Sequence, residues 1–117
     1  MKIYHYPKCS TCKQALAYLD SKKIAYQAID RSKTPPSKSE LKAMYLATGS
    51  ELRKLFNTSG KVYREGGYKD KIKDMNIAEA IGLLHANGML IKRPFVISNR
   101  TKFVGFGDDQ KEKLTGW

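Results

Sequence analysis

Residues 2–12 read KIYHYPKCSTC, and this stretch decides the fold. Lys2–Tyr6 is short, β-prone and closed by a proline, which predicts a strand. The turn Pro7–Ser10 then leads into a helix that is expected to run to about Lys22. Ile24–Ile29 is predicted to be a second short strand. Strand, helix and strand within about thirty residues form a βαβ unit, in which the two strands are normally parallel.

The middle of the chain is predicted to be helical. Ser37 and Glu40 form a capping box at the start of one helix, because each side chain can satisfy an unpaired amide there, and Gly49 can stop that helix. Short helical pieces are expected at Leu52–Phe56 and Val62–Glu65. Asn76 and Glu79 repeat this capping pattern, so a further helix is expected to begin there, and Gly88 is expected to stop it.

The last thirty residues are predicted to return to strand. A strand at Met89–Lys92 leads to Arg93-Pro94, and Phe95–Ser98 and Lys102–Phe106 are expected to pair as a hairpin. Asp108 or Asp109 is expected to cap a final short helix. The whole pattern is that of one mixed α/β domain spanning residues 1–117.

Composition and charge narrow the class of protein. The chain has 117 residues, a formal net charge of +11 and two cysteines. It contains no apolar run near the ~20 residues that span a bilayer, and its start does not read as a signal peptide. We therefore expect a cytoplasmic protein, with no membrane partner, in a compartment where a close cysteine pair is more often catalytic, redox-active or metal-binding than a structural staple.

The positive charge favours acidic partners, whether small oxyanions, nucleic acid or an acidic protein surface. The lysines are scattered along the sequence, which a well-solvated surface would also explain. The sequence has no dense basic tract and no recognisable DNA-reading motif, so direct nucleic-acid binding is not expected.

The motif Cys9-Ser10-Thr11-Cys12 follows the first predicted strand and opens the first helix. A helix N-terminus presents unpaired amides and about half a positive charge, and both stabilise a thiolate. The position predicts that Cys9 has a lowered pKa and attacks, and that Cys12 resolves the mixed species into an internal disulfide. Two alternatives stay open at this point: half of a zinc site that includes His5 or His85, or two inert core thiols.

Four further segments carry a family resemblance: Tyr4–Cys9, Pro35–Ser37, Leu55–Gly60 and Ile91–Val96. With them the chain resembles the arsenate reductase (ArsC)/Spx family over essentially its whole length. The resemblance implies a thioredoxin-like fold, with a mixed four-stranded sheet and an inserted helical subdomain. Residues 1–30 and 89–117 would form the thioredoxin-like core, and residues 36–88 the helical insertion.

The resemblance also implies site residues. In this fold a proline before the third strand is usually cis and lies against the active cysteine, as Pro94 would; a trans-proline at a strand start is the alternative. The family's glutaredoxin-coupled arsenate reductases use one cysteine, matched by Cys9, and three arginines. Arg93 matches one arginine, whereas Asn57 and the Gly105 region stand at the other two places. The chain is thus most similar to the Cys-x-x-Cys branch that lacks the full arsenate-binding set.

The functional hypothesis is a bacterial thiol–disulfide oxidoreductase of the arsenate reductase type. Its reducing equivalents would come from glutathione and glutaredoxin or from thioredoxin, with no bound cofactor or metal, and the protein is expected to be a monomer. The alternative is an Spx-type regulator that binds RNA polymerase through a Cys9–Cys12 disulfide switch. The candidate catalytic residues are Cys9, Cys12 and Arg93, and the residues expected to bind substrate or shape the site are Lys8, Ser10, Thr11, Asn57 and Pro94.

Overall fold

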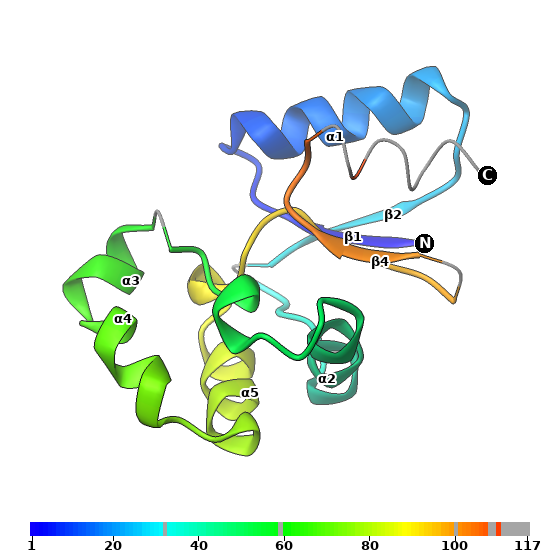
Figure 1. Ribbon diagram of the computed structural model, residues 1–117. Coiled ribbons are helices and arrows are strands. Elements are labelled where there is room, and N and C mark those ends of the chain that lie inside the picture. Colours follow the sequence, from blue (N-terminus) through cyan, green and yellow to red (C-terminus); the bar gives the residue numbers. More distant parts are fainter. Residues whose placement is uncertain (32, 59, 100, 108–109, 111–117) are drawn as a thin grey trace.

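A four-stranded mixed sheet forms the centre of the molecule (Figure 1). Its strands are β1 (Lys2–His5), β2 (Gln27–Asp30), β3 (Phe95–Ile97) and β4 (Lys102–Val104), in the order β2-β1-β3-β4. β1 pairs in parallel with β2 and antiparallel with β3, which pairs antiparallel with β4. The computed structural model describes residues 1–31, 33–58, 60–99, 101–107 and 110. The expected final helix at Asp108 or Asp109 falls outside this described part.

The βαβ unit is as predicted, except at the start of its second strand. α1 (Ser10–Ser21) connects β1 to β2. The predicted strand at Ile24–Ile29 begins too early, because Lys23 has a left-handed φ of 56° and the Ile24 amide donates to the Leu19 carbonyl at 3.0 Å. These residues therefore complete the end of the helix. Pairing begins at Gln27, whose amide donates to the Met1 carbonyl at 2.8 Å.

Helices connect β2 to β3, and we call them the helical block. They are α2 (Lys38–Ala47), η1 (Leu52–Leu55), α3 (Lys61–Glu65), α4 (Tyr68–Lys71), η2 (Ile72–Asp74), α5 (Ile77–Ala86) and η3 (Gly88–Leu90), where η marks a 3₁₀ helix. Both predicted caps are confirmed: the Ser37 hydroxyl accepts from the Glu40 amide at 3.1 Å, and the Asn76 side chain accepts from the Glu79 amide at 2.8 Å. Whether the insertion behaves as a separate subdomain stays a prediction.

One expectation for the end of the helical block was wrong. Met89–Lys92 is not a strand, because the Asn87 side chain accepts from the Met89 amide and begins η3; only Ile91 makes an isolated bridge, to Phe56. α5 ends at Ala86 and is followed by its C-cap Asn87, so Gly88 stands just beyond the helix, as expected for the residue that stops it. α4 and η2 were not predicted from the sequence; they follow Gly67, which has a left-handed conformation (φ 66°).

The two faces of the sheet bury different partners. Ile3, Val96 and Phe103 point towards α1 and pack with Leu19. Tyr4, Phe95 and Ile97 point the other way and join the larger core with the helical block. This alternation follows from the period of two along a strand. Figure 1 shows the result, with α1 over one face of the sheet and α2 and α5 on the opposite side. Among the described residues, no helix combines the length and apolar character that crossing a bilayer requires.

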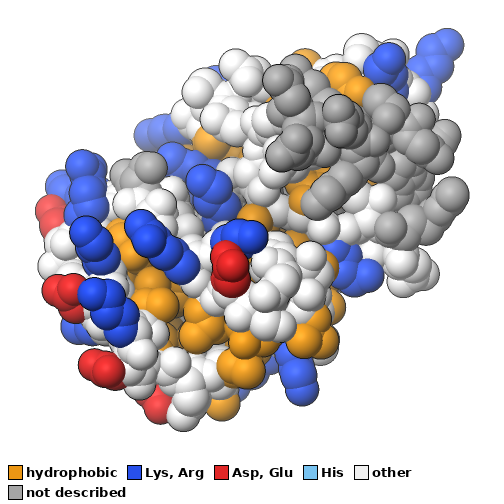
Figure 2. All heavy atoms as spheres, in the orientation of Figure 1, with side chains coloured by type: hydrophobic (Ala, Val, Ile, Leu, Met, Phe, Trp, Pro, Cys, Tyr) orange, Lys and Arg blue, Asp and Glu red, His pale blue; other side chains and the backbone are white. Residues whose placement is uncertain are grey.

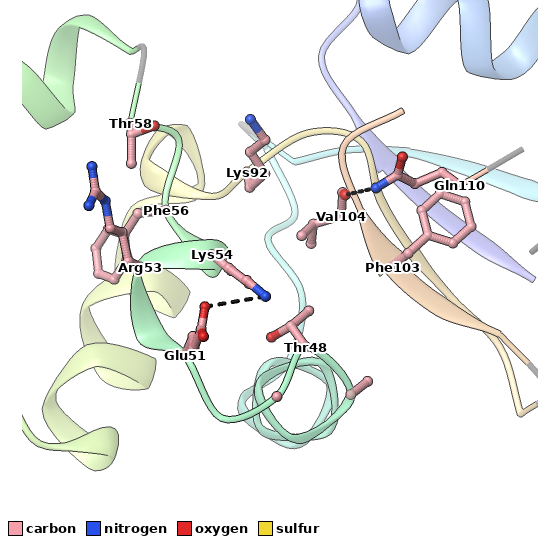
Figure 3. Close-up of a pocket in the computed structure, with 12 residues that line it drawn as sticks. Thr48, Glu51, Arg53, Lys54, Phe56, Thr58, Lys92, Phe103, Val104 and Gln110 are labelled. Atoms are coloured by element: carbon pink, nitrogen blue, oxygen red, sulfur yellow. Dashed lines mark hydrogen bonds and ion pairs between the residues drawn. The ribbon is translucent and has the colours of Figure 1, made fainter. Parts of the chain in front are cut away.

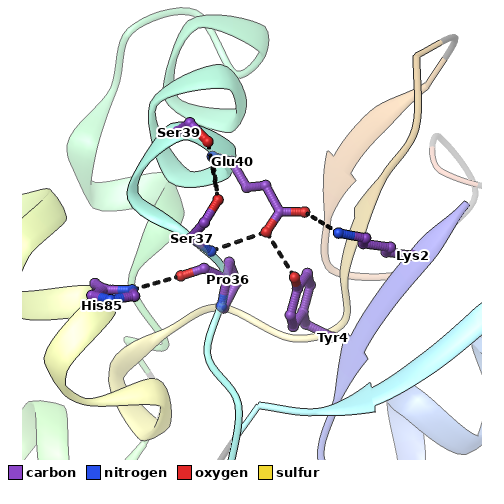
Figure 4. A network of polar contacts seen from close by, with 7 residues as sticks. All are labelled: Lys2, Tyr4, Pro36, Ser37, Ser39, Glu40 and His85. Atoms are coloured by element: carbon purple, nitrogen blue, oxygen red, sulfur yellow. Dashed lines mark hydrogen bonds and ion pairs between the residues drawn. The ribbon is translucent and has the colours of Figure 1, made fainter.

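A single carboxylate joins the sheet to the helical block (Figure 4). Glu40 accepts hydrogen bonds from the Tyr4 hydroxyl at 2.7 Å and from the Ser37 amide at 2.9 Å, and it pairs with Lys2 at 3.4 Å. Burial alone would raise the pKa of Glu40, but the Ser37 amide, the Tyr4 hydroxyl and Lys2 hold it below its usual value. Burial and the bond to Glu40 raise the pKa of Tyr4. The same carboxylate thus completes the capping box of α2 and anchors β1.

We expect Glu40→Ala to lower the free energy of unfolding by about 1–3 kcal/mol, because it leaves part-buried donors unpaired. Glu79→Ala is the matched control, since Glu79 occupies the same cap position of α5 but is exposed. Urea denaturation at neutral pH measures both. Equal losses in the two variants would contradict the anchoring role.

The same contact has a pH dependence. Because the folded pKa of Glu40 lies below its unfolded value, its contribution to stability is complete above the unfolded pKa, about 4.3, and is lost as the pH falls through the folded pKa. Glu40→Gln keeps the side chain but cannot titrate. Urea denaturation of Glu40→Gln below pH 4 should therefore show a smaller acid loss than the wild type.

Candidate active site

Cys9 is the N-cap residue of α1, and its sulfur takes the place of the usual capping oxygen. The Cys9 Sγ accepts from the Cys12 amide at 3.3 Å, and the Cys9 backbone is extended (φ −86°, ψ 119°). The first turn of α1, all of it described, has no acidic residue that would compete for this position. The Cys9 amide donates to the Tyr6 carbonyl at 2.9 Å, which fixes the turn from β1 into the helix. The unpaired amides of the helix start therefore face the sulfur.

The two thiols have opposite protonation tendencies. Burial alone would raise the pKa of Cys9, but hydrogen bonds from the Cys12 thiol and amide, the charge of Arg93 and the Thr11 amide lower it below the usual value. Burial raises the pKa of Cys12, and the neighbouring Cys9 thiolate raises it further. Both are free thiols. Cys12 is 0% exposed and Cys9 7% exposed, so Cys9 is the member of the pair that a substrate can reach.

A hollow of about 490 Å³, which we call the thiol pocket, surrounds Cys9. It contains every candidate residue of the sequence analysis except Cys12 and Pro94. Its lining is Lys8, Cys9, Ser10, Thr11, Asn57, Lys92, Arg93, Gly105 and Phe106. Asn57 and Gly105 do lie beside Arg93, at the places where the resemblance put two further arginines. The Arg93–Pro94 peptide bond is cis, as the resemblance implied. Lys92 is a cationic lining residue that the sequence analysis did not single out.

Arg31 is a buried charged residue near the site that was not predicted from the sequence. Its side chain is fully buried, and its Nε and one terminal nitrogen have no hydrogen-bond partner among the described residues. The other terminal nitrogen contacts the Met89 sulfur at 3.2 Å. Burial and Arg93 lower the pKa of Arg31, whereas negative charge on the cysteine pair and on Asp30 raises it. Because the cysteines and Arg31 interact through their charges, the Arg31 guanidinium adds positive charge near the cysteine pair.

The Tyr6 ring contacts both guanidinium groups. Its ring centroid is 5.5 Å from the Arg31 guanidinium carbon and 5.9 Å from that of Arg93. Cation–π contacts at this range favour a positive charge over the ring. η3 packs closely against the Arg31 backbone, because a Cβ at Gly88 would overlap the Arg31 carbonyl oxygen. No local sequence signal pointed to Arg31, because its contacts with Gly88 and Met89 join segments more than fifty residues apart.

A larger hollow of about 790 Å³, which we call the basic groove, lies next to the thiol pocket and shares Lys92 with it. Figure 3 shows residues of η1 on one side and residues of β4 on the other, with Lys92 between them. Its charged lining residues are Glu51, Arg53, Lys54 and Lys92. Glu51 and Lys54 pair at 3.2 Å.

Neither histidine joins the cysteines in a metal site. His85 Nδ1 is 3.0 Å from the Pro36 carbonyl oxygen, which places it between α5 and the start of α2. His5 lies in β1. Within the described part of the chain, no three side chains of His, Cys, Asp or Glu lie close enough together to hold a metal ion.

The mixed sheet, the cysteine pair at the start of α1 and the neighbouring Arg93-Pro94 define a thioredoxin-like α/β protein with a candidate thiol site. A family model described as "ArsC family" matches residues 4–114. The chain belongs to the ArsC family.

Similar proteins support this assignment. The uncharacterized protein YusI of Bacillus subtilis is 43% identical over 113 residues, which are 97% of this chain and 96% of YusI. A crystal structure described as a possible arsenate reductase from Streptococcus mutans UA159 is 43% identical, with a TM-score of 0.88 over 97% of this chain and 96% of that one.

Two relatives with named functions differ from one another. An arsenate reductase of Rhizobium meliloti is 32% identical over 82% of this chain and 67% of its own length. The global transcriptional regulator Spx of Streptococcus mutans is 25% identical over 89% of this chain and 74% of its own length. The relatives of this chain thus include both a protein named as an enzyme and one named as a regulator.

We expect Arg93→Ala to raise the pKa of Cys9, because the variant removes a positive charge that favours the thiolate. Alkylation of Cys9 by iodoacetamide at neutral pH should become several-fold slower. Lys73→Ala, which removes an exposed charge paired with Asp70, is the control and should leave the rate unchanged. An unaltered titration of Cys9 in Arg93→Ala would remove Arg93 from the site.

Arg31→Met should leave the free energy of unfolding unchanged or higher, because a buried, incompletely bonded charge is replaced by an apolar side chain of similar length. The same variant should slow alkylation of Cys9, since positive charge behind the pair is lost. Urea denaturation and the alkylation rate measure the two effects separately. A less stable protein with normal Cys9 reactivity would make Arg31 purely structural.

Proposed function

We propose that this protein is a thiol–disulfide oxidoreductase in which Cys9 is the nucleophile and Cys12 the resolving thiol. The observation that carries the proposal is the Cys9 sulfur capping α1, with a lowered pKa beside a buried, protonated partner. A thiolate at neutral pH and a thiol in reach of it are the two requirements of disulfide exchange.

In the first step the Cys9 thiolate attacks one sulfur of a disulfide substrate. A Cys9–substrate disulfide forms, and the other substrate sulfur leaves as a thiolate that takes a proton from water. The negative charge on Cys9 is then gone, so one cause that raised the pKa of Cys12 disappears. Cys12 loses its proton to water and attacks the Cys9 sulfur, which releases the second substrate thiolate and forms the Cys9–Cys12 disulfide.

The net result is that the substrate gains two electrons and the protein loses two. An external thiol must then reduce the Cys9–Cys12 disulfide. We propose glutathione with glutaredoxin, or thioredoxin, as the donor, in the cytoplasm where these thiols are kept reduced. No bound cofactor is required for either half of this cycle.

The lining of the thiol pocket favours a disulfide over arsenate. Arg93 is the one arginine among its described lining residues, next to the single charges of Lys8 and Lys92. Lysine neutralises an oxyanion as a point charge but lacks the planar fork that binds two oxygens at once. We therefore expect arsenate-dependent oxidation of glutathione or thioredoxin to be weak, although the relative from Rhizobium meliloti is named arsenate reductase.

A second candidate function is a redox-sensing regulator that binds RNA polymerase. The similarity to Spx and the proximity of the two cysteines favour it. Co-purification of RNA polymerase with the reduced or the oxidised protein, but not both, would support this function. Sustained thiol-dependent turnover with a disulfide substrate supports the enzyme.

Two single variants test the roles of the cysteines. Cys9→Ser should abolish turnover of a model disulfide with glutathione as donor, because the nucleophile is lost. Cys12→Ser should still react once and should accumulate a mixed disulfide on Cys9, detectable as a mass increase by mass spectrometry. Equal alkylation of both cysteines at neutral pH in the wild type would contradict this division of roles.

A further inference from the structure

Three neighbouring hollows form a continuous basic track that begins at Cys9. The thiol pocket shares Lys92 with the basic groove. The basic groove in turn shares Arg53 and Thr58 with a third hollow of about 370 Å³, which is lined by Arg64 and Lys69. Because neighbouring hollows share lining residues, the three lie next to one another along one surface, which an extended ligand could follow. We call this surface the basic track.

The track is positively charged along its whole length. Lys8 and Arg93 stand at the thiol end, Lys92 and Arg53 at the two junctions, and Arg64 at the far end. Figure 2 shows Lys and Arg side chains crowding the same side of the helical block, where η1 and α3 lie. The acidic residue among the described lining residues is Glu51, and Lys54 neutralises it.

The cations that matter most are available to a ligand. Arg53 and Arg64 are exposed, and neither has a carboxylate within salt-bridge distance in the described part of the chain. The nearby acidic residues are already paired, Glu51 with Lys54 and Glu65 with Lys61. Close, unneutralised arginines in a concave surface raise the local concentration of anionic ligands and speed their association.

The thiol end identifies the class of ligand. Whatever fills the track must also present sulfur to Cys9, which nucleic acid cannot do. A small disulfide would fill the thiol pocket alone and leave Arg53 and Arg64 without a role. An extended polypeptide can carry a cysteine and several carboxylates a few residues apart.

We propose that the basic track binds an extended acidic segment of a polypeptide whose cysteine, in a disulfide, is exchanged at Cys9. The inference rests on the proposed thiol–disulfide function, since it names the substrate class of that same site. The exchange is the one given above: Cys9 and Cys12 are oxidised to a disulfide, and the disulfide of the polypeptide is reduced to two thiols.

The experiment uses the full-length protein and two synthetic peptides. Each has one central cysteine in a mixed disulfide with thionitrobenzoate, whose release is followed by absorbance. One peptide has glutamates on both sides of the cysteine, and its partner has glutamines at the same positions. A neutral dipyridyl disulfide, which has no carboxylates, reports the intrinsic reactivity of Cys9.

At low salt we expect the glutamate peptide to react about tenfold faster than the glutamine peptide, and the difference to vanish near 1 M salt. Arg53→Ser and Arg64→Ser should each reduce this preference, and the double variant should remove most of it. Lys22→Ser is the matched control, because it removes one charge at the end of α1, away from the track. All of these variants should react normally with the dipyridyl disulfide.

Different failures have different meanings. Equal rates for the two peptides, with a normal dipyridyl reaction, would overturn the basic track and leave the thiol function standing. A slow dipyridyl reaction in the wild type would instead overturn the proposed function itself. A single-stranded oligonucleotide that inhibits the glutamate peptide more strongly than polyglutamate does would assign the track to nucleic acid and overturn the proposal.

Discussion

The unpaired amides at the start of α1 are the constraint on which the site depends. A helix start leaves backbone donors without partners, and most proteins satisfy them with an oxygen of Ser, Thr, Asp or Asn. Here the acceptor is the Cys9 sulfur, at 3.3 Å from the Cys12 amide. The interaction is stronger with a thiolate than with a thiol, since a charged acceptor makes the better hydrogen bond. The βαβ connection therefore both begins a helix and favours the thiolate form of Cys9.

Contacts of Arg31 and Arg93 hold positive charge near Cys9. Tyr6 contacts both Arg31 and Arg93, and η3 approaches the Arg31 backbone closely at Gly88. Burying an incompletely bonded guanidinium is unfavourable. The large core shared by the sheet and the helical block offsets such a cost, because it buries many apolar side chains at once. The helical block thus contacts the Arg31 segment through η3, and its η1 and α3 residues line much of the basic track.

Local sequence signals predicted much of the fold and the centre of the site. The helix caps at Ser37 and Asn76, the hairpin after Pro94 and the placement of Cys9 at a helix start all depend on neighbouring residues, and the structure has them. The failures have other causes. η3 replaces a strand because of one Asn87 side-chain bond, and Arg31 is buried by segments more than fifty residues away. Pairing across such distances leaves no periodic pattern in the sequence. The roles of the individual site residues stay predictions.

The cap at Cys9 also links the redox state of the protein to the stability of its fold. A group whose folded pKa lies below its unfolded value stabilises the folded state at every pH above the unfolded pKa, and this stabilisation is lost as the pH falls through the folded pKa. Oxidation to the disulfide removes the thiolate, and with it the charge that the helix start and Arg93 stabilise. The interactions that stabilise the Cys9 thiolate therefore stabilise the folded protein in its reduced form but not in its oxidised form. Each interaction that lowers the Cys9 pKa stabilises the reduced protein relative to the oxidised one. The same interaction therefore makes the Cys9–Cys12 disulfide a stronger oxidant.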